Sequence, residues 1–297
     1  MRRRRRNVGS TAVTAAIEDS VRLRLSLPPD FSFDAVVRSH GWYDLAPFSY
    51  DSSRGELRTG AGPAAWTFRV RDGRLEVSGR CGDARSVRAM ARRVFSLDVD
   101  LSAFDTALAD EPELKRALAR GGGRMLRAPT LFEDAVKMLL TTNCSWAATR
   151  GMVRRLVSLS QDGSFPGQEE IARMRPSALG GKVRCGYRTG ALSRFARRVA
   201  SGRLDLSLWE RRETSATEVR EAILAEHGFG PYAAEGLLRV LGRHEYLALD
   251  SWIRKQYRRF YPGPAKTADG AIARRYARFG DFKGLALWLD MTKGVRP

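Results

Sequence analysis

The sequence predicts a mainly helical α+β protein, in which a small N-terminal antiparallel β-sheet domain precedes a larger all-helical domain. Two patterns support this division. Apolar and polar residues alternate with period two at 21–27 and at 66–70, which is typical of half-buried strands. From about Asp83 onward the chain has a series of segments with helical character instead. Hydrophobic residues make up 43% of the chain, which is enough for a packed core.

The N-terminal region divides into two parts. Residues 1–18 contain the run Arg2–Arg6 without a following apolar stretch, so we expect a disordered basic leader and no signal peptide. Residues 19–95 form the expected sheet domain with flanking helices. Its elements are the strands Val21–Leu27, Trp66–Val70 and Leu75–Ser78, a turn at 71–74 and a short helix at Ser32–His40. Two alternating segments around an Asp-Gly turn are typical of a β-hairpin.

The helical domain is expected to span residues 96–297. Its start signals are local, because Thr130 followed by Glu133 resembles a capped helix start and Pro231 suits a first helical position, where its missing N–H is not needed. Glycines at 121–123 and 180–181 mark loops. The expected helices, including one that ends the sheet domain, are 84–95, 130–142, 147–159, 190–200, 216–226, 231–241, 251–260 and 268–293.

The charge of the chain is strongly positive. Lysine and arginine number 52 against 33 aspartate and glutamate residues, which gives a net charge of +19. This surplus favours a polyanionic partner, because contacts with phosphates release counterions and drive association. An acidic membrane surface or simple solubility would account for the same composition. No apolar run approaches the roughly eighteen residues of a membrane helix, so we expect a cytoplasmic protein.

The cysteine pattern argues against a metal centre. Cys81, Cys144 and Cys185 are far apart and form no CxxC pair, which excludes a zinc ribbon and a four-cysteine iron–sulfur cluster. The chain has only 3 histidines, so a histidine-rich site is not expected either. The sequence therefore predicts no metal ligands.

A glycine turn between two amphipathic segments is the first functional candidate. In the turn from His227 to Pro231, glycines at 228 and 230 allow positive φ and the close approach of another backbone. The amides of the turn and of the following helix start form an anion site that can hold a phosphate without a charged side chain. An ordinary helical hairpin, with glycines required only by the turn, explains the same residues.

Asp250 is the second functional candidate. It follows an apolar run and immediately precedes the expected helix 251–260. A carboxylate in this position can simply cap the helix through backbone N–H groups. A partly buried aspartate at a helix start can also face a pocket in its ionised form, so the position alone leaves both roles open.

The order of these features resembles the helix-hairpin-helix DNA glycosylase superfamily (HhH-GPD), which includes 8-oxoguanine DNA glycosylase, bacterial 3-methyladenine DNA glycosylase II and endonuclease III. Its members have a helix, a Gly-x-Gly turn, a second helix and then an aspartate, at about the distance that separates Gly230 from Asp250. Residues 132–156 and the segment Cys185-Gly-Tyr-Arg-Thr189 resemble the 8-oxoguanine glycosylases in particular. The resemblance covers roughly 131–289, and a sheet domain of matching size precedes it.

The resemblance implies a role for each matching position. Asp250 aligns with the catalytic aspartate, which would stabilise the oxocarbenium-like sugar as the base leaves and help orient the attacking water. Asn143 would fill the gap left by the flipped nucleotide, Tyr187 would wedge beside the orphaned base, and Arg188 would contact that strand. For Asn143 and Tyr187, loop packing or capping is the structural alternative. The turn that would grip the DNA backbone consists of Gly228, Phe229 and Gly230.

One departure from the superfamily bears on strand cleavage. Bifunctional members have a lysine just after the turn, and this chain has Tyr232 there. Tyrosine cannot form the Schiff base that backbone cleavage requires, so we expect no AP-lyase activity. The alkyl-purine members have tryptophan at this position, which Tyr232 resembles more closely. Lys137 and Lys255 are the two candidates to substitute for the lysine, although surface or DNA-backbone roles suit them as well.

The base pocket is assigned through the end of the chain. Aligning 280–284 with the 8-oxoguanine glycosylases puts Leu287 where that family has a glutamine that reads the base edge. The residues assigned to the pocket are Tyr232, Trp252, Trp288 and Lys137, with Trp42 as a further aromatic. Aromatic residues suit the site because electron-poor alkylated purines stack well on electron-rich rings. A large aromatic residue in an apolar helix is also a common core residue, and Trp288 fits that role too.

These features together predict a monofunctional DNA N-glycosylase that flips out a damaged purine and hydrolyses its N-glycosidic bond, which starts base excision repair. An alkylated purine is slightly favoured over 8-oxoguanine. Tyr232 and Leu287 favour the branch that removes alkylated bases. The sheet domain and the Asn143–Tyr187 pair favour the 8-oxoguanine branch. The alternatives are a catalytically silent helix-hairpin-helix DNA-binding or damage-sensing protein, and a bifunctional glycosylase/lyase that uses Lys137 or Lys255. Retention of Asp250 argues against a silent binder.

The expected partner is double-stranded DNA that contains a damaged base. We expect a monomer with no membrane association and a cytoplasmic, nucleoid-associated location. No cofactor and no iron–sulfur cluster are expected. The resemblance leaves room for one structural monovalent cation at the hairpin.

Overall fold

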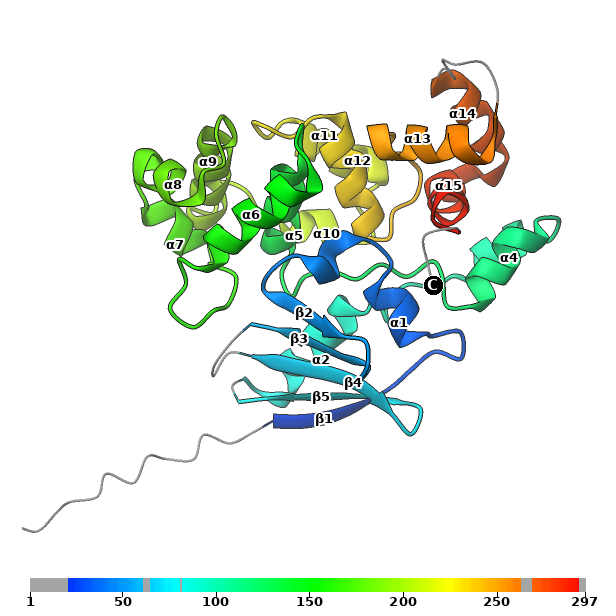
Figure 1. Ribbon diagram of the computed structural model, residues 1–297, viewed down its shortest axis with the longest axis horizontal. Coiled ribbons are helices and arrows are strands. Elements are labelled where there is room, and N and C mark those ends of the chain that lie inside the picture. The colour runs from blue at the N-terminus through cyan, green and yellow to red at the C-terminus, as the bar shows by residue number, and fades with distance from the viewer. Residues whose placement is uncertain (1–20, 61–64, 81, 263–268, 294–297) are drawn as a thin grey trace, which may run out of the picture.

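The computed structural model describes residues 21–60, 65–80, 82–262 and 269–293. The predicted basic leader, residues 1–18, and Cys81 lie outside these ranges. A five-stranded antiparallel sheet precedes a succession of helices (Figure 1), which confirms the predicted fold class. None of the described helices is both long enough and apolar enough to cross a membrane.

The sheet has the strand order β1-β5-β4-β3-β2, and all neighbouring strands are antiparallel. Its strands are β1 (Val21–Ser26), β2 (Phe48–Asp51), β3 (Glu56–Thr59), β4 (Trp66–Arg71) and β5 (Arg74–Gly79). The predicted β4–β5 hairpin is confirmed, and Asp72 and Gly73 have φ of 49° and 66°, as the two-residue turn of an Asp-Gly pair requires. The sequence does not predict β2 and β3, because four-residue strands are too short for a periodic pattern to stand out.

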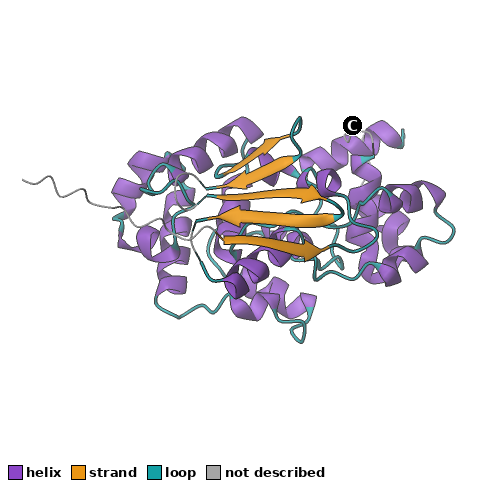
Figure 2. Ribbon diagram, turned by 90° about the horizontal axis from the view of Figure 1, so that it is seen from below, coloured by secondary structure: helices purple, strands orange, loops and turns teal. Residues whose placement is uncertain are grey.

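One face of the sheet packs against helices, and the other face is open, as Figure 2 shows. Leu57, Phe68 and Leu75 are fully buried on the packed face. Phe95, which follows α2 (Ala84–Val94), contacts Phe68 edge to face with ring centroids 5.2 Å apart. Asp83 caps α2 by accepting two backbone N–H groups. The sheet thus presents an apolar surface toward the helices that carry the candidate site.

Most of the predicted helices are confirmed, with small shifts at their ends. These are α1 (Phe33–Val37), α2, α5 (Leu131–Thr141), α6 (Trp146–Val157), α9 (Arg188–Ala200), α11 (Ala216–Leu224), α12 (Pro231–Val240) and α13 (Ser251–Phe260). Further helices are not predicted from the sequence. These are α3 (Ser102–Ala107), α4 (Pro112–Ala119), α7 (Gln168–Arg173), α8 (Pro176–Val183) and α10 (Ser207–Glu210). They are shorter than the window in which a helical period can be recognised. The loop predicted from the glycines at 180–181 is wrong, because both lie inside α8.

The C-terminal helix differs from the prediction. The expected single helix 268–293 is wrong, because the described part of this segment contains two helices joined by a 3₁₀ segment. The three parts are α14 (Asp269–Tyr276), the 3₁₀ segment Ala277–Phe282 and α15 (Lys283–Thr292). Gly280 has φ 53° and ψ −124°, a conformation that no helix contains and that glycine adopts readily. The chain therefore changes direction before α15.

Two hydrophobic clusters hold the described residues together. The larger one joins the sheet, through residues such as Phe68 and Val77, to α5, α6, α9, α11 and α12. The second joins α3 and α4 to α13, α14 and α15, and it includes Leu287. The sheet and the α11–α12 hairpin share one core, so the packing does not mark a boundary at residue 95. The domain boundaries predicted at residues 18 and 95 stay predictions.

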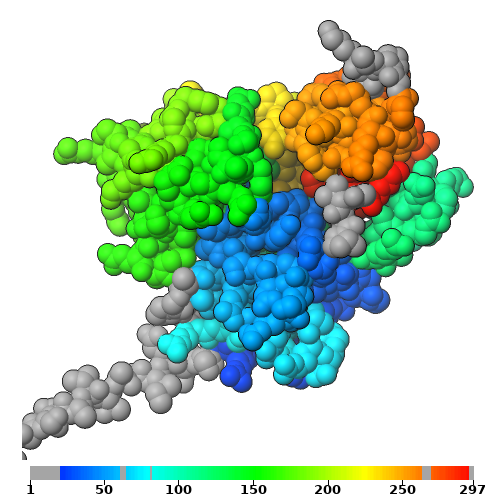
Figure 3. All heavy atoms as spheres, in the orientation of Figure 1, coloured from blue at the N-terminus to red at the C-terminus, as the bar shows by residue number. Residues whose placement is uncertain are grey.

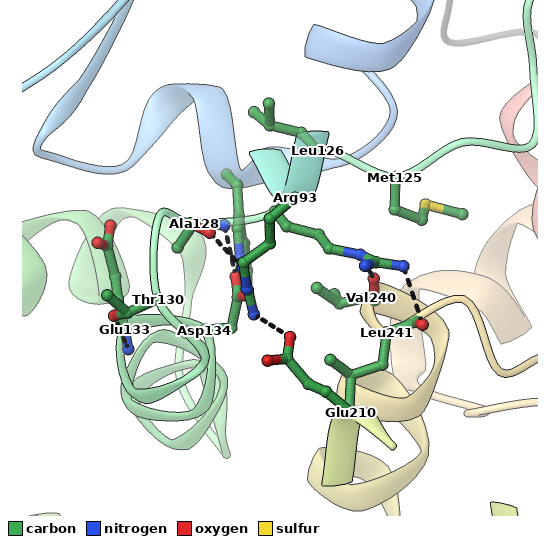
Figure 4. Close-up of polar contacts among 12 residues, drawn as sticks. Arg93, Met125, Leu126, Ala128, Thr130, Glu133, Asp134, Glu210, Val240 and Leu241 are labelled. Atoms are coloured by element: carbon green, nitrogen blue, oxygen red, sulfur yellow. Dashed lines mark hydrogen bonds and ion pairs between the residues drawn. The ribbon is translucent and has the colours of Figure 1, made fainter. Parts of the chain in front are cut away.

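A buried polar network lies between the sheet region and the helices (Figure 4). Arg93 contacts Asp134 and Glu210 through Nη1 and Nη2, each at 2.9 Å. Asp134 Oδ1 also accepts hydrogen bonds from the Ala128 N–H at 2.8 Å and from Trp42 Nε1 at 2.7 Å. Trp42 is 3% exposed, so it belongs to the core and its expected place in a base-binding aromatic box is wrong.

Candidate functional site: a glycine turn, an aspartate and an exposed Asn–Tyr pair

The glycine turn joins α11 to α12, and Figure 3 shows this part of the chain between the green helices and the orange α13. Ser215 and Glu218 form a reciprocal capping box at the start of α11, which fixes where the hairpin begins. Gly228 has φ 94°, and a Cβ at this position would lie 2.5 Å from Ala191 Cβ on α9. Both the backbone angle and the close approach therefore require glycine at 228.

Gly230 has a different role from the one predicted. Its φ of −92° and ψ of −179° are those of extended backbone, so the positive φ that glycine allows is not used at this position. It is the N-cap residue of α12, and a Cβ on it would meet no atom within 4 Å. Gly230 and Pro231 are both exposed, so the positive end of the α12 dipole faces open space that an anion can enter.

Phe229 lies between these two glycines and turns inward. It is 4% exposed, and its ring centroid lies 5.2 Å from that of Phe195 on α9. The side chain therefore anchors the turn in the core, and the DNA contact predicted for Phe229, which only its backbone could make, stays a prediction. The surface of the turn consists of main chain at Gly228 and Gly230.

Asp250 is the N-cap residue of α13, as one of its two predicted roles requires. Its Oδ1 accepts a hydrogen bond from the Ile253 N–H at 2.6 Å, and its Oδ2 makes no hydrogen bond to any described residue. The preceding loop is held by Ala248, whose φ is 48° and whose N–H donates to Glu235 Oε2 at 3.0 Å. The cap thus uses one oxygen and leaves the second available for other chemistry.

Arg239 is a neighbour of Asp250 that the sequence does not predict. It is 8% exposed on α12, and its guanidinium carbon lies 4.6 Å from the ring centroid of Trp288. Burial lowers its pKa to about 10, and the charge of Asp250 is the largest effect that opposes this shift. The site therefore holds a buried cation near the carboxylate.

Tyr232 follows the turn, on the same helix. Burial raises the pKa of its phenol, a hydrogen bond with Thr141 opposes the shift and the nearby charge of Asp250 adds to it. A pocket of about 360 Å³ opens beside it. Its lining residues are Pro231, Tyr232, Glu235, Tyr246, Leu247, Leu249, Arg254, Asp269 and Lys283. Of the residues assigned to the base pocket, only Tyr232 lines this cavity.

Asn143 and Tyr187 come together although 44 residues separate them. Asn143 Nδ2 donates to the Tyr187 hydroxyl at 3.3 Å. Asn143 has φ 45°, a left-handed conformation that asparagine tolerates better than most residues. Tyr187 is 68% exposed, so the pair projects from the surface instead of packing within a loop.

Arg188 contacts both loops that carry this pair. It is 6% exposed, and its guanidinium donates to the backbone carbonyl of Thr142 and to the Thr142 hydroxyl, the latter at 3.2 Å. Its guanidinium carbon also lies 4.5 Å from the ring centroid of Tyr187. Arg188 therefore connects the loops that carry Asn143 and Tyr187, and its predicted contact with the DNA strand stays a prediction.

The remaining aromatic candidates pack on one another. Trp252 and Trp288 have ring centroids 5.7 Å apart at an angle of 43°, which is the separation of two rings in direct contact. A base cannot lie between them in this arrangement, and their assignment to the base pocket stays a prediction. Trp288 Nε1 donates to the Ser39 carbonyl at 3.0 Å. Leu287 is fully buried and offers no polar atom to a base.

The two lysine candidates lie in opposite environments. Lys137 is 0% exposed, and its Nζ lies 2.6 Å from Glu133 Oε1 and 4.6 Å from the ring centroid of Phe48. Burial raises the pKa of Glu133, and the charge of Lys137 opposes this. Lys137 therefore lies inside the protein core, and its assignment to a DNA-accessible base pocket stays a prediction that this burial disfavours. Lys255 is exposed on α13.

No group of three or more metal-binding side chains occurs in the part of the chain that the structure describes. Cys144 and Cys185 are both reduced. At the hairpin, the carbonyl of Glu226 already accepts the Phe229 N–H at 3.1 Å. The monovalent cation expected there stays a prediction.

Comparisons with known proteins address the fold. No protein-family model and no curated protein matches the sequence. Among solved structures, MBOgg1 in complex with a low-affinity DNA ligand has a TM-score of 0.71 at 22% identity, covering 93% of this chain and 95% of that one. The chain has the fold of the helix-hairpin-helix DNA glycosylases.

Two further structures support this assignment of the fold. The 8-oxoguanine glycosylase/lyase of Clostridium acetobutylicum, bound to DNA with cytosine opposite 8-oxoguanine, has a TM-score of 0.67 at 15% identity, covering 90% of this chain and 93% of that one. The 3-methyladenine DNA glycosylase of Archaeoglobus fulgidus has a TM-score of 0.69 at 20% identity, covering 92% and 98%. The glycosylase fold therefore spans nearly the whole chain, and both substrate branches share it.

Proposed function

We propose that the chain is a DNA N-glycosylase that removes a damaged purine from double-stranded DNA. The observation that carries the proposal is Asp250, whose Oδ1 is fixed by the cap of α13 while Oδ2 makes no hydrogen bond to a described residue. A carboxylate that is held in this way can stabilise the positive charge that develops on the sugar as the base leaves. It can also accept a proton from the water that attacks the sugar carbon.

The other site residues supply the binding that this chemistry needs. The exposed helix start at Gly230 offers backbone N–H groups to a phosphate. The hydrogen-bonded pair of Asn143 and Tyr187, with Tyr187 68% exposed, suits insertion into the duplex. Such insertion would offset part of the few kcal/mol that extracting a base costs. The net charge of +19 favours association with DNA as a whole.

The same geometry supports base removal without strand cleavage. Tyr232 occupies the position after the turn, and burial raises its pKa, so it remains a neutral phenol with no amine to attack the sugar. Lys137 is fully buried beside Glu133 and cannot reach DNA without a rearrangement of the core. Lys255 is the exposed alternative. Borohydride trapping tests the proposal, because a covalent adduct that disappears in Lys255→Gln would contradict it.

One assay tests the activity as a whole. Duplexes that each carry 8-oxoguanine, 3-methyladenine, 1,N6-ethenoadenine, hypoxanthine or uracil are incubated with the protein, with and without hot alkali. Strand breaks that appear only after alkali support a monofunctional glycosylase and identify the base. Asp250→Asn should abolish them, and undiminished excision by this variant would contradict the assigned mechanism. Tight DNA binding without excision of any lesion would indicate the silent damage-sensing protein instead.

A further inference from the structure

Arg239 is buried without an acidic partner. Its only hydrogen bond to a described residue runs from Nη2 to the Leu247 carbonyl at 2.6 Å, and its Nε is buried and makes none. Arg239 forms no ion pair with any carboxylate among the described residues. Burial of a charge is costly unless an opposite charge or a full set of hydrogen bonds compensates for it. Arg239 is therefore a buried cation whose charge no contacting carboxylate among the described residues neutralises.

Two other arginines are paired with carboxylates, whereas the buried Arg188, like Arg239, contacts no carboxylate among the described residues. Arg93 contacts the carboxylates of Asp134 and Glu210 at 2.9 Å. Arg127 pairs with Asp98 at 3.4 Å and also donates to two backbone carbonyls at the end of α12. Both arginines join separate segments, as expected of structural arginines. Arg239 lacks the carboxylate, and its Nε, like that of Arg93, makes no hydrogen bond to a described residue.

The position of Arg239 relates it to the candidate site. Tyr232, Glu235 and Arg239 follow one another at the spacings that place residues on one face of a helix. Arg239 Nη2 also donates to the carbonyl of Leu247, in the loop that leads to Asp250, and the charges of Asp250, Tyr232 and Glu235 favour its protonated form. Arg239 is therefore a charged donor next to the carboxylate that the proposed function makes catalytic.

The Trp288 ring bears on which bases this arrangement would accept. The aromatic face that would attract an electron-poor or cationic base already carries the Arg239 guanidinium, at 4.6 Å. Two like charges in a site of low dielectric repel each other strongly. A purine that is alkylated on a ring nitrogen carries a positive charge in DNA, so it would meet a cation where the aromatic box was expected to attract it.

We propose that Arg239 determines the substrate class, by selecting neutral purines that carry carbonyl oxygens and rejecting cationic alkylated purines. The inference rests on the proposed glycosylase function and reverses the slight preference for alkylated purines that the sequence favours. Its guanidinium would donate to an acceptor on the flipped base. 8-Oxoguanine is a member of the accepted class, and 7-methylguanine is a member of the rejected class.

The chemistry of the leaving group agrees with this selection. When the bond from C1′ to N9 breaks, the electron pair goes to the purine, so a neutral purine departs as an anion. A cationic donor stabilises that developing charge. The water oxygen then bonds to C1′, its proton passes through the Asp250 carboxylate to solvent, and solvent returns a proton to the purine. A cationic purine departs as a neutral base and gains nothing from Arg239.

The test compares single-turnover excision from duplexes that carry 8-oxoguanine or 7-methylguanine. Arg239→Gln removes the charge and keeps an amide that can reach the Leu247 carbonyl. We expect the 8-oxoguanine rate to fall about 100-fold, as for the loss of one donor that acts on developing negative charge. The 7-methylguanine rate should rise about 10-fold, because the repulsion is removed.

Two further variants serve as controls. Arg239→Lys retains the charge without the planar fork, so it should still reject 7-methylguanine while its 8-oxoguanine rate falls. Arg243→Gln is a matched control, because Arg243 also donates to backbone carbonyls, those of Thr214 and Arg211 at 2.5 Å. It should leave the ratio of the two rates unchanged. Melting temperatures of all variants report whether each one folds.

The outcomes are distinguishable. Opposite changes of the two rates in Arg239→Gln support the inference. A parallel loss of both rates would show that Arg239 is only structural, and an unchanged ratio would show that it does not select the base, so either result overturns the inference. Excision of another lesion of the panel above, without excision of 8-oxoguanine, would overturn the inference alone. Absence of excision of every lesion by the wild-type protein would contradict the proposed function itself, and the inference with it.

Discussion

Replacing Gly228 by alanine would place a methyl group where the structure has no room for one. The new Cβ would lie 2.5 Å from Ala191 Cβ and 3.1 Å from Leu139 Cδ1, on a backbone with φ 94°. The left-handed conformation costs about 1–2 kcal/mol for alanine, and overpacking costs about 1–3 kcal/mol. Alanine regains about 0.4–1 kcal/mol by restricting the unfolded chain. The free energy of unfolding should therefore fall by about 2–4 kcal/mol.

Gly230→Ala is the matched partner of this variant. Gly230 has extended backbone, and nothing lies within 4 Å of the position that an alanine methyl group would take. Alanine is a poorer N-cap residue than glycine by up to about 1 kcal/mol, so little stability should be lost. The methyl group would however occupy the open space at the start of α12, where a phosphate is expected. Binding to duplex DNA should weaken about 10-fold, or about 1.4 kcal/mol.

Urea denaturation and fluorescence anisotropy with a labelled duplex measure the two effects. The variants should separate them, with Gly228→Ala losing stability and Gly230→Ala losing DNA affinity at nearly wild-type stability. Gly228→Ala with wild-type stability would refute the packing argument. Gly230→Ala with wild-type DNA affinity would refute the role of the turn as an anion site.

Two buried charged or titratable groups and the exposed wedge give three further predictions. Asp134→Asn leaves Arg93 with only one of its two carboxylates, that of Glu210, so the free energy of unfolding in urea should fall by about 3 kcal/mol; a loss below about 1 kcal/mol would contradict the network. Tyr187→Ala removes an exposed side chain, so excision from duplex DNA should slow while the unfolding free energy stays within about 0.5 kcal/mol of wild type; slower excision from single strands to the same degree would argue against wedging. Burial lowers the pKa of His244 from 6.5 to about 3, so its contribution to stability is complete above pH 6.5 and is lost as the pH falls toward 3; the urea midpoint should drop between pH 7 and pH 5, and His244→Leu should flatten that slope.

Local sequence signals predict those parts of the fold that local chemistry decides. The Asp-Gly turn at 72–73 sets the β4–β5 hairpin, and Asp250 starts α13 at the residue expected from its capping position. The short elements depend on tertiary packing instead. β2, for example, forms by pairing with β3, and four residues carry too little pattern to show this in advance. Gly280, which interrupts the predicted C-terminal helix, is compatible with that helix on propensity alone.

The residues of the candidate site also divide into those that local sequence signals predict and those that depend on contacts between distant segments. The capping position of Asp250 can be read from its own neighbours, whereas the contact between Asn143 and Tyr187 joins segments 44 residues apart and is anticipated only through the family resemblance. Arg239 could not be found from the pattern, because an arginine near the end of an exposed-looking helix is usually solvated. Its burial depends on the loop at Leu247 and on Trp288, which approach it from other segments.

The two roles that the sequence leaves open for Asp250 are compatible, and the cap makes the catalytic test cleaner. Capping uses Oδ1 and orients the carboxylate at the N-terminal end of α13. Asparagine is as good an N-cap residue as aspartate, and its side-chain oxygen can accept the same Ile253 N–H. Asp250→Asn should therefore keep the unfolding free energy within about 1 kcal/mol of wild type while it removes the charge. A loss of excision in a variant of unchanged stability assigns the effect to the carboxylate and not to the helix that it begins.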